Sequence, residues 1–264
     1  MIDVSTPDSR FGRELRRWRH NSARMLPGQQ PQRLLDDARE HWLNCSDVQW
    51  KADSHWQSGL GDDAFDAVGR HHLALFDTFA EALGLPKCPE TVIEWGCGGG
   101  ANAVSFAQRC QRFIAADISP ESVDECVFQV ALACDAKTEG VVVDVNRPEA
   151  ASDPFLGACD LFLCLHVMGM TARPIEALRI VRIAERTLKP GGMAMIQINY
   201  HTTDKATRGR RRDYRRDPAT MTTFAVDDFW RLCAERGLTP RLVELEGRNG
   251  VNERSAYFAL TKPR

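Results

Sequence analysis

Residues 91–120 read TVIEWGCGGGANAVSFAQRCQRFIAADISP, and this stretch decides the fold of the chain. Its first five residues, 91–95, are mostly apolar and β-branched, which is typical of a short strand buried on both faces. A glycine-rich turn follows at residues 96–100, where glycine allows positive φ and lets the backbone approach a ligand closely. Residues 101–109 predict a helix whose free N–H groups point at the turn, and residues 113–116 predict a second strand. This order of elements indicates a nucleotide-type binding corner.

Two acidic residues beside the glycine turn indicate which ligand the corner suits. Glu94 stands near the end of the first strand, two residues before Gly96. A carboxylate there would repel a pyrophosphate but attract a cationic α-amino group. Asp117 ends the second strand, about where an acid binds the two hydroxyls of a ribose. Although Gly96, Gly98 and Ala101 also satisfy the dinucleotide fingerprint, the corner fits an adenosine that carries an amino acid better than one that carries a phosphate.

The segment 94–100, EWGCGGG, resembles the first motif, E/D-x-G-x-G-x-G, of the class I S-adenosylmethionine (SAM)-dependent methyltransferases. Later segments resemble further elements of that family in the same order. Residues 141–145 resemble its third strand, residues 160–166 its fourth, and residues 188–192, LKPGG, the turn before its fifth. The resemblance covers roughly residues 91–264. It implies an α/β, Rossmann-like fold with a seven-stranded, mostly parallel sheet whose last strand is antiparallel, helices on both faces and a helical N-terminal extension.

The resemblance also implies SAM as the cofactor and S-adenosylhomocysteine (SAH) as its product. It assigns the methionine amino group to Glu94, the ribose to Asp117 and the adenine to the segment around Asp144. The cofactor-binding residues expected on this basis are Glu94, Gly96, Cys97, Gly98, Asp117, Ile118, Asp144, Val145 and Leu165. The sequence contains no HExxH, EF-hand or P-loop motif, and it predicts no metal site.

Catalytic candidates follow the fourth and fifth predicted strands, because ligands of open parallel sheets bind at the carboxyl ends of the strands. His166 follows the fourth strand, and Tyr200 and His201 follow the fifth. Methyl transfer requires an aligned and desolvated nucleophile, and a hydroxyl acceptor also requires a base, a role that suits histidine. We interpret His166 either as that base or as a packing or cofactor-contacting group. Tyr200 and His201 are the other candidates.

The region before the first strand predicts a helical extension. Residues 11–21 and 32–43 have helical spacing, and residues 63–83 predict a longer amphipathic helix. In related methyltransferases the N-terminal segment covers the cofactor. We therefore expect residues 1–62 to form an extension or lid and residues 63–264 to form the SAM-binding domain.

The predicted loop at residues 45–61 is rich in aromatic side chains, namely Trp50, His55 and Trp56. These residues either form part of a lid that excludes water from the substrate or attach the extension to the core. His72, on the predicted helix 63–83, is interpreted as a core or pocket-lining residue.

Residues 205–217, KATRGRRRDYRRD, carry seven cationic residues against two acids. In the family that the chain resembles, this connection often faces the substrate. We consider three interpretations of this segment. It binds an anionic group of the acceptor, it binds RNA with Tyr214 stacked on a base, or it is a solvated charged segment.

Composition sets limits on the remaining possibilities. The chain has 264 residues, 43% of them hydrophobic and 27% charged, with a formal net charge of −2, enough for one α/β domain with an appendage. This near-neutral charge argues against bulk affinity for nucleic acid. The nine cysteines contain no CxxC pair and indicate reduced thiols, and no apolar run reaches the ~18 residues that span a bilayer. We expect a cytoplasmic protein with no membrane partner.

The sequence thus predicts a SAM-dependent methyltransferase that acts on an oxygen of a small-molecule acceptor, such as a metabolite, natural product or sugar, which can be anionic. Methylation of a small-molecule nitrogen is one alternative. Methylation of RNA, bound by residues 205–217, is another, and a non-catalytic SAM-binding regulatory protein is a third. The sequence does not indicate the oligomeric state.

Overall fold

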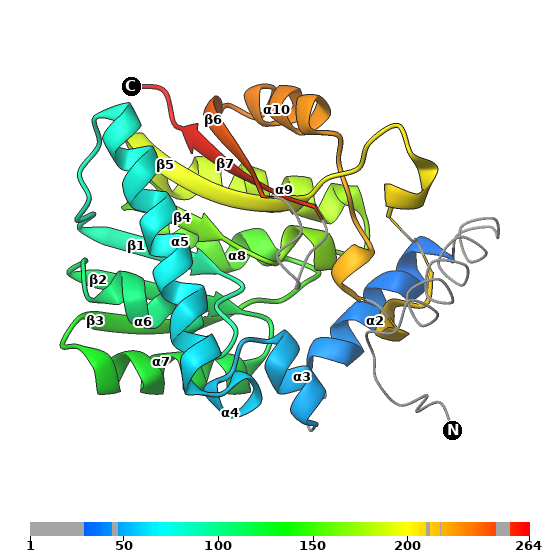
Figure 1. Cartoon of the computed structure of the whole chain (residues 1–264), viewed down its shortest axis with the longest axis horizontal. Coiled ribbons are helices and arrows are strands. Elements are labelled where there is room, and N and C mark those ends of the chain that lie inside the picture. The colour runs from blue at the N-terminus through cyan, green and yellow to red at the C-terminus, as the bar shows by residue number, and fades with distance from the viewer. Residues whose placement is uncertain (1–28, 44–46, 210–211, 217, 247–253) are drawn as a thin grey trace, which may run out of the picture.

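The structure is a computed structural model that describes residues 29–43, 47–209, 212–216, 218–246 and 254–264. The helix expected at residues 11–21 lies outside the described residues. The described residues contain one seven-stranded sheet (Figure 1). Its strands are β1 (Thr91–Trp95), β2 (Arg112–Asp117), β3 (Lys137–Val142), β4 (Cys159–Cys164), β5 (Leu188–Asn199), β6 (Thr239–Glu246) and β7 (Ser255–Thr261).

The strand order is β3-β2-β1-β4-β5-β7-β6. The pairs β1–β2, β1–β4, β2–β3 and β4–β5 are parallel, whereas β7 runs antiparallel to both β5 and β6. Because the order reverses between β1 and β4, a crevice forms where these two strands end. The predicted Rossmann-like sheet with an antiparallel last strand is confirmed.

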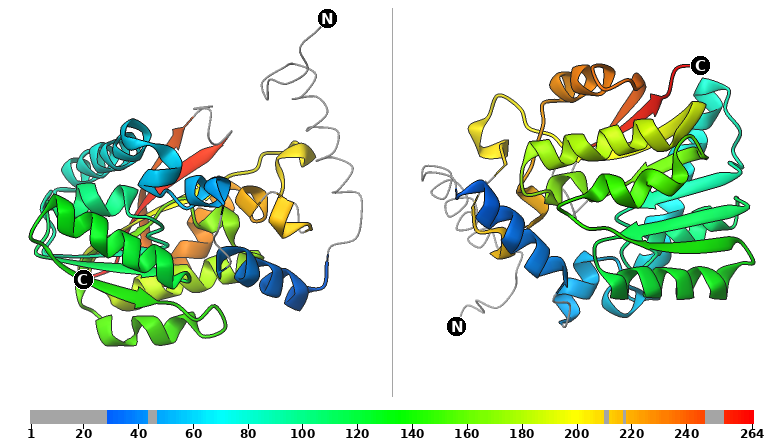
Figure 2. Two further views of the ribbon diagram at one scale, coloured as in Figure 1. Left: turned by 90° about the horizontal axis from the view of Figure 1, so that it is seen from below. Right: turned by 180° about the vertical axis from the view of Figure 1, so that it is seen from behind.

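Helices cover both faces of the sheet (Figure 2). The helices are α2 (Pro31–Leu43), α3 (Val48–Asp53), α4 (Gln57–Leu60), α5 (Asp62–Leu83), α6 (Ala101–Ala107), α7 (Pro120–Ala133), α8 (Pro148–Ser152), α9 (Pro174–Thr187) and α10 (Val226–Ala234). One core cluster joins α5, α6 and α7 to the sheet, and the other joins α9 and α10 to the opposite face. The central strands are buried throughout, which explains their continuous apolar sequence.

Local sequence signals account for several helix ends. Ser119 caps α7 by accepting a hydrogen bond from Ser122 N, and Pro120 occupies the first turn, where its missing N–H is not needed. Gly84 ends α5 in the left-handed conformation, at φ +63. The end of α5 therefore agrees with the helix predicted at residues 63–83.

Two expectations about local structure are wrong. The segment predicted as a loop, residues 45–61, contains α3 and α4 within its described part, because Asp47 caps α3 by accepting a hydrogen bond from Trp50 N at 2.7 Å. The third strand lies at Lys137–Val142, not at residues 141–145, because it pairs residue by residue with β2. Pairing, not hydrophobicity, fixes the position of this edge strand.

None of the helices in the described part of the chain is long and apolar enough to cross a membrane. In Figure 1, α2 and α3 lie beside the carboxyl ends of the central strands, on the side away from the end of α5 that precedes β1. Their position brings the N-terminal region to the crevice.

Candidate active site

A cavity lies at the carboxyl ends of β1, β2 and β4, and α2 and the loop after α3 cover part of it. It contains about 1110 Å³ of empty space, including space open to solvent. No group of three metal-ligating side chains occurs among the described residues.

The glycine turn forms the floor of the cavity and is tightly packed. Gly96 N donates a hydrogen bond to Ala116 O at 2.7 Å, which ties the turn to the end of β2. Gly96 and Gly98 have φ values of +82 and +50. A Cβ at Gly96 would lie 2.2 Å from Val167 Cγ2, and one at Gly98 would lie 2.1 Å from Ser54 O. Both positions therefore require glycine.

The Gly98→Ala variant is expected to displace the loop after α3, because the new methyl group would meet the backbone of Ser54. The positive φ adds about 1–2 kcal/mol of strain. We expect at least a roughly tenfold loss of SAH affinity, equivalent to about 1.4 kcal/mol, measured by isothermal titration calorimetry.

Gly84→Ala is the matched control for that variant. Gly84 also has a positive φ, +63, but nothing lies within 4 Å of an added Cβ. This variant should lose stability through strain alone and keep its SAH affinity. An equal loss of affinity in both variants would contradict the proposed contact with the loop.

Glu94 lies beneath the turn and is fully buried, with 0% of its surface exposed. Its Oε1 accepts a hydrogen bond from Asn102 Nδ2 at 2.9 Å, whereas no described residue provides a partner for its buried Oε2. Burial raises the pKa of this carboxyl to about 8, although the bond from Asn102 opposes the shift. A buried oxygen without a partner is costly, and a cationic amino group would satisfy it. Glu94 thus fits the amino group of SAM.

Asp117 lines the cavity at the end of β2. Backbone N–H groups of Gly98 and Ser119 donate to its Oδ2 and Oδ1, each at 3.0 Å, and so fix the carboxylate. Burial raises its pKa, an effect that these hydrogen bonds oppose. Each oxygen can accept one further hydrogen bond, which suits the two hydroxyls of a ribose.

The other predicted cofactor residues fall into two groups. Those that line the cavity are Gly96, Gly98, Asp117, Ile118, Val145 and Leu165. Cys97, which belongs to the turn, and Glu94, which lies at the end of β1, are buried and are not among the lining residues. Asp144 is directed elsewhere, because its Oδ1 accepts a hydrogen bond from Asn146 N at 2.9 Å and its carboxylate lies 3.8 Å from Arg147 Nε. The structure therefore does not bring Asp144 to the cavity.

His166 is the one predicted catalytic residue that lines the cavity. It follows β4 at a φ of +59, and its backbone N–H donates to Gln197 Oε1 at 3.0 Å. Burial lowers the pKa of its imidazole well below the usual value, and the nearby histidines lower it further. The ring is therefore neutral at pH 7, because burial disfavours its protonated form.

Tyr200 and His201 do not line this cavity. Tyr200 forms a β-bridge with Phe224, and His201 Nδ1 is 3.1 Å from Thr223 Oγ1. This pairing continues β5 beyond its end and holds both residues against another segment. Their catalytic role thus gains no support from the geometry.

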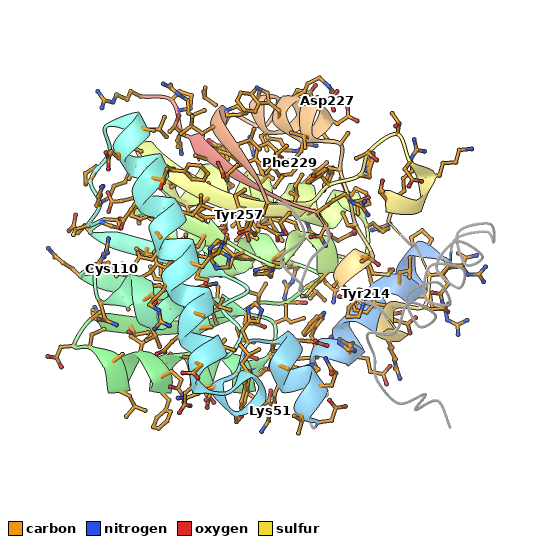
Figure 3. The ribbon with its side chains drawn as sticks, in the orientation of Figure 1. Lys51, Cys110, Tyr214, Asp227, Phe229 and Tyr257 are labelled. Atoms are coloured by element: carbon orange, nitrogen blue, oxygen red, sulfur yellow. The ribbon has the colours of Figure 1, made fainter. Side chains whose placement is uncertain are left out.

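The structure also places Tyr214 at the cavity, where it has another role than stacking on an RNA base. Tyr214, in a short 3-10 turn (Tyr214–Arg216), is 1% exposed and lies beside α2 (Figure 3). Its hydroxyl accepts a hydrogen bond from Trp42 Nε1 at 2.7 Å and donates to Met170 O. Arg215 pairs with Glu40. Tyr214 and Arg215 are therefore docked on α2, and Tyr214 has no face free to stack on a base.

The sequence contained a pattern that corresponds to the side chains by which α2 lines the cavity. Leu35, Ala38 and Trp42 recur at helical spacing and line the cavity together. The spacing predicts an apolar face, but it does not indicate what that face covers.

Comparisons with known proteins agree with a methyltransferase fold. The 1,6-didemethyltoxoflavin-N1-methyltransferase of Burkholderia thailandensis has 17% sequence identity and a TM-score of 0.59, over 90% of this chain and 93% of that one. The N-methyltransferase NodS of Bradyrhizobium japonicum, solved with SAH, has 16% identity and a TM-score of 0.57, over 78% and 91%. Magnesium protoporphyrin IX methyltransferase of Synechocystis, also with SAH, has 16% identity and a TM-score of 0.55, over 75% and 85%.

At these identities the likeness shows the fold alone. No curated protein matches the chain. The family model described as "Methyltransferase domain" matches residues 69–243, and the chain belongs to this family. It is a class I SAM-dependent methyltransferase, as the motif around the glycine turn predicted, and SAM is the cofactor of this class. The match begins inside α5 and does not include α2, α3 or α4.

Proposed function

We propose that this methyltransferase transfers the methyl group of SAM to an oxygen of a small-molecule acceptor. The observation that carries the proposal is the apolar and aromatic wall that α2 adds to the cavity, where Leu35 and Trp42 line it together with Met170 and Ala172. Tyr214 closes one end of this wall. Such a chamber suits a compact apolar body, whereas single-stranded nucleic acid needs an open cationic groove.

The position of His166 supports oxygen as the methylated atom. SAM supplies an electrophilic methyl group when it is bound. A hydroxyl acceptor must lose its proton as its oxygen attacks, and His166, whose side chain lines the cavity, is the group that we propose takes it. A candidate base is thus within reach of an acceptor in the cavity.

The rim of the cavity is suited to an anionic group on the acceptor. Arg39 on α2 and Arg179 on α9 both line the cavity. Arg179 forms a two-point ion pair with Glu149, with N–O distances of 2.7 and 2.5 Å. Arg39 forms no such close ion pair within the described ranges, although its charge helps to lower the pKa of Asp144, so its guanidinium is the better candidate for an acceptor anion.

Nitrogen methylation is the second candidate, because two of the similar solved structures are described as N-methyltransferases. A neutral amine attacks without losing a proton first, so it depends less on His166. RNA is a less favoured substrate, because Tyr214 is buried and cannot stack on a base. The extension at residues 1–62 remains a proposed lid.

The proposal predicts where labelled methyl groups from SAM will appear in a fractionated cell lysate incubated with the protein. We expect label in the small-molecule fraction, bound to oxygen when the product is analysed by NMR. The Asp117→Ala variant, which removes the proposed ribose ligand, is the negative control. Label on nitrogen would establish the second candidate, and label in RNA would refute the small-molecule assignment. SAM binding without any label would indicate a non-catalytic protein.

A further inference from the structure

Two histidines from distant parts of the chain meet at the wall of the cavity. His55 follows α3 and His166 follows β4, yet their ring centroids lie 5.1 Å apart at an interplanar angle of 88°. Both side chains line the cavity. An edge-to-face contact of this kind fixes the plane of each ring, and therefore the direction in which its nitrogens point.

Both histidines hold a backbone conformation that most side chains avoid. Their φ values are +56 and +59, and Asp213 is the one other non-glycine residue with a positive φ in the described part of the chain. This conformation costs on the order of 1–2 kcal/mol per residue and persists where surrounding contacts impose it. Such strain on both sides of one ring contact is typical of a functional site.

Contacts next to each histidine fix its backbone. Ser54 O, immediately before His55, accepts a hydrogen bond from Gly99 N at 2.8 Å. On the other side, His166 N donates to Gln197 Oε1 at 3.0 Å. The glycine turn therefore positions His55, and β5 positions His166.

A third imidazole packs against the pair. The ring of His72, on α5, lies 5.2 Å from that of His166, and its Nδ1 is 2.7 Å from Asn102 Oδ1. Because Asn102 uses its Nδ2 to donate to Glu94, its Oδ1 accepts, and the proton is on Nδ1 of His72. Burial lowers the pKa of His55 and of His72 to about 4.

The cluster is therefore neutral at pH 7. Beyond His72, the next titratable group on α5 is His71, whose Nε2 lies 2.8 Å from Glu246 Oε1 of β6. The acidic side chains on the same cavity are Asp53, Asp117 and Glu176.

We propose that His55 is a positioning residue for the base His166, and that the N-terminal extension supplies it to the active site. The inference rests on the proposed function, because it assigns the proton of the acceptor to His166. The O–H bond of the acceptor breaks and its proton moves to a ring nitrogen of His166. The O–C bond forms as the C–S bond breaks, and the electron pair of that bond stays on sulfur. His55 fixes the plane of the ring that receives the proton.

His55 lies outside the residues that match the family model. The matched residues, 69–243, include His166 and His72 but not His55. The orientation of the base therefore depends on a segment that precedes the shared domain.

Histidine NMR of the full chain with added SAH tests the proposal by comparing the wild type with His55→Asn. Asparagine tolerates positive φ, so this variant removes the imidazole without adding strain. In the wild type we expect one neutral tautomer of His166 between about pH 5 and pH 8. In the variant we expect two tautomers in exchange and a pKa that is roughly one unit higher, because water reaches the ring. His55→Gly, which also accepts positive φ, replaces the variant if His55→Asn does not bind SAH.

Gln57→Ala is the matched control. Gln57 Oε1 accepts a hydrogen bond from Gln129 Nε2 at 3.0 Å, which fastens α4 to α7 away from the ring contact. This variant should lower thermal stability and leave the tautomer and the pKa of His166 unchanged. An equal change in Gln57→Ala would assign the effect to a loosened segment and overturn the proposal.

An unchanged tautomer and pKa of His166 in a His55 variant with SAH bound would also overturn it. A different experiment tests whether His166 is the base at all. If a His166 variant kept full turnover, the proposed function of His166 would be wrong, whatever the result for His55.

Discussion

The His166→Gln variant is expected to turn over about 10²- to 10⁴-fold more slowly than the wild type, the usual contribution of a positioned base. Its SAM affinity should stay within about twofold, because the groups proposed to hold the cofactor, Glu94 and Asp117, are unchanged. Turnover is measured as transfer of labelled methyl groups to the small-molecule fraction, and affinity by titration calorimetry.

Two comparisons make the result on His166 specific. His71→Gln is the control, since His71 lies on the outer side of α5, where 47% of its side chain is exposed and it pairs with Glu246. Tyr200→Phe and His201→Gln test the other candidates, and we expect smaller losses because neither side chain lines the cavity. Equal losses of turnover and SAM affinity in His166→Gln would instead point to a structural role.

SAM binding is expected to release a proton at pH 7 and to strengthen as the pH rises toward about 8. The carboxyl of Glu94, with its pKa raised to about 8 by burial, is mostly protonated at pH 7 in the protein without cofactor. It must ionise to pair with an ammonium group. Calorimetry in buffers with different ionisation enthalpies measures the protons released. Binding without proton release at pH 7 would contradict the role of Glu94.

The Glu94→Gln variant separates cofactor recognition from folding. It should lose about 100-fold in SAM affinity, because a charged hydrogen bond contributes about 1.5–3 kcal/mol. In the free wild-type protein the folded state binds more protons than the unfolded state between the usual pKa, 4.5, and about 8. Stability therefore falls as the pH rises through this range, by on the order of a few kcal/mol. The variant should lack this fall and be the more stable protein above pH 8, as measured by thermal denaturation at several pH values.

The sequence predicted the elements whose signals are local. A buried strand, glycines that require positive φ, and acids at strand ends are each encoded within a few residues, so the glycine turn, Glu94 and Asp117 were found without a structure. The mostly parallel, seven-stranded sheet with an antiparallel last strand was also predicted, from the resemblance of the ordered motifs to those of class I methyltransferases.

Predictions from local sequence patterns were wrong where contact with a distant segment determines the structure. The apolar run at residues 141–145 predicted the third strand, but pairing with β2 moved the strand to Lys137–Val142 and left Asp144 in a turn. Tyr214 lies in a charged segment that suggested RNA, whereas its hydroxyl bonds Trp42 and Met170 and buries the ring. In each case the deciding contact comes from a segment that is remote in sequence.

The sequence by itself determined the family, the cofactor corner and the position of His166 after the fourth strand, because these depend on residue types at short spacing. Only the tertiary structure decided which side chains share the cavity. It brought His55 to His166, directed His201 toward Thr223, and placed Trp42 at the wall of the cavity. The physical reason is that packing between distant segments sets these distances, and a hydrophobic pattern specifies that a face is buried but not which residues it meets.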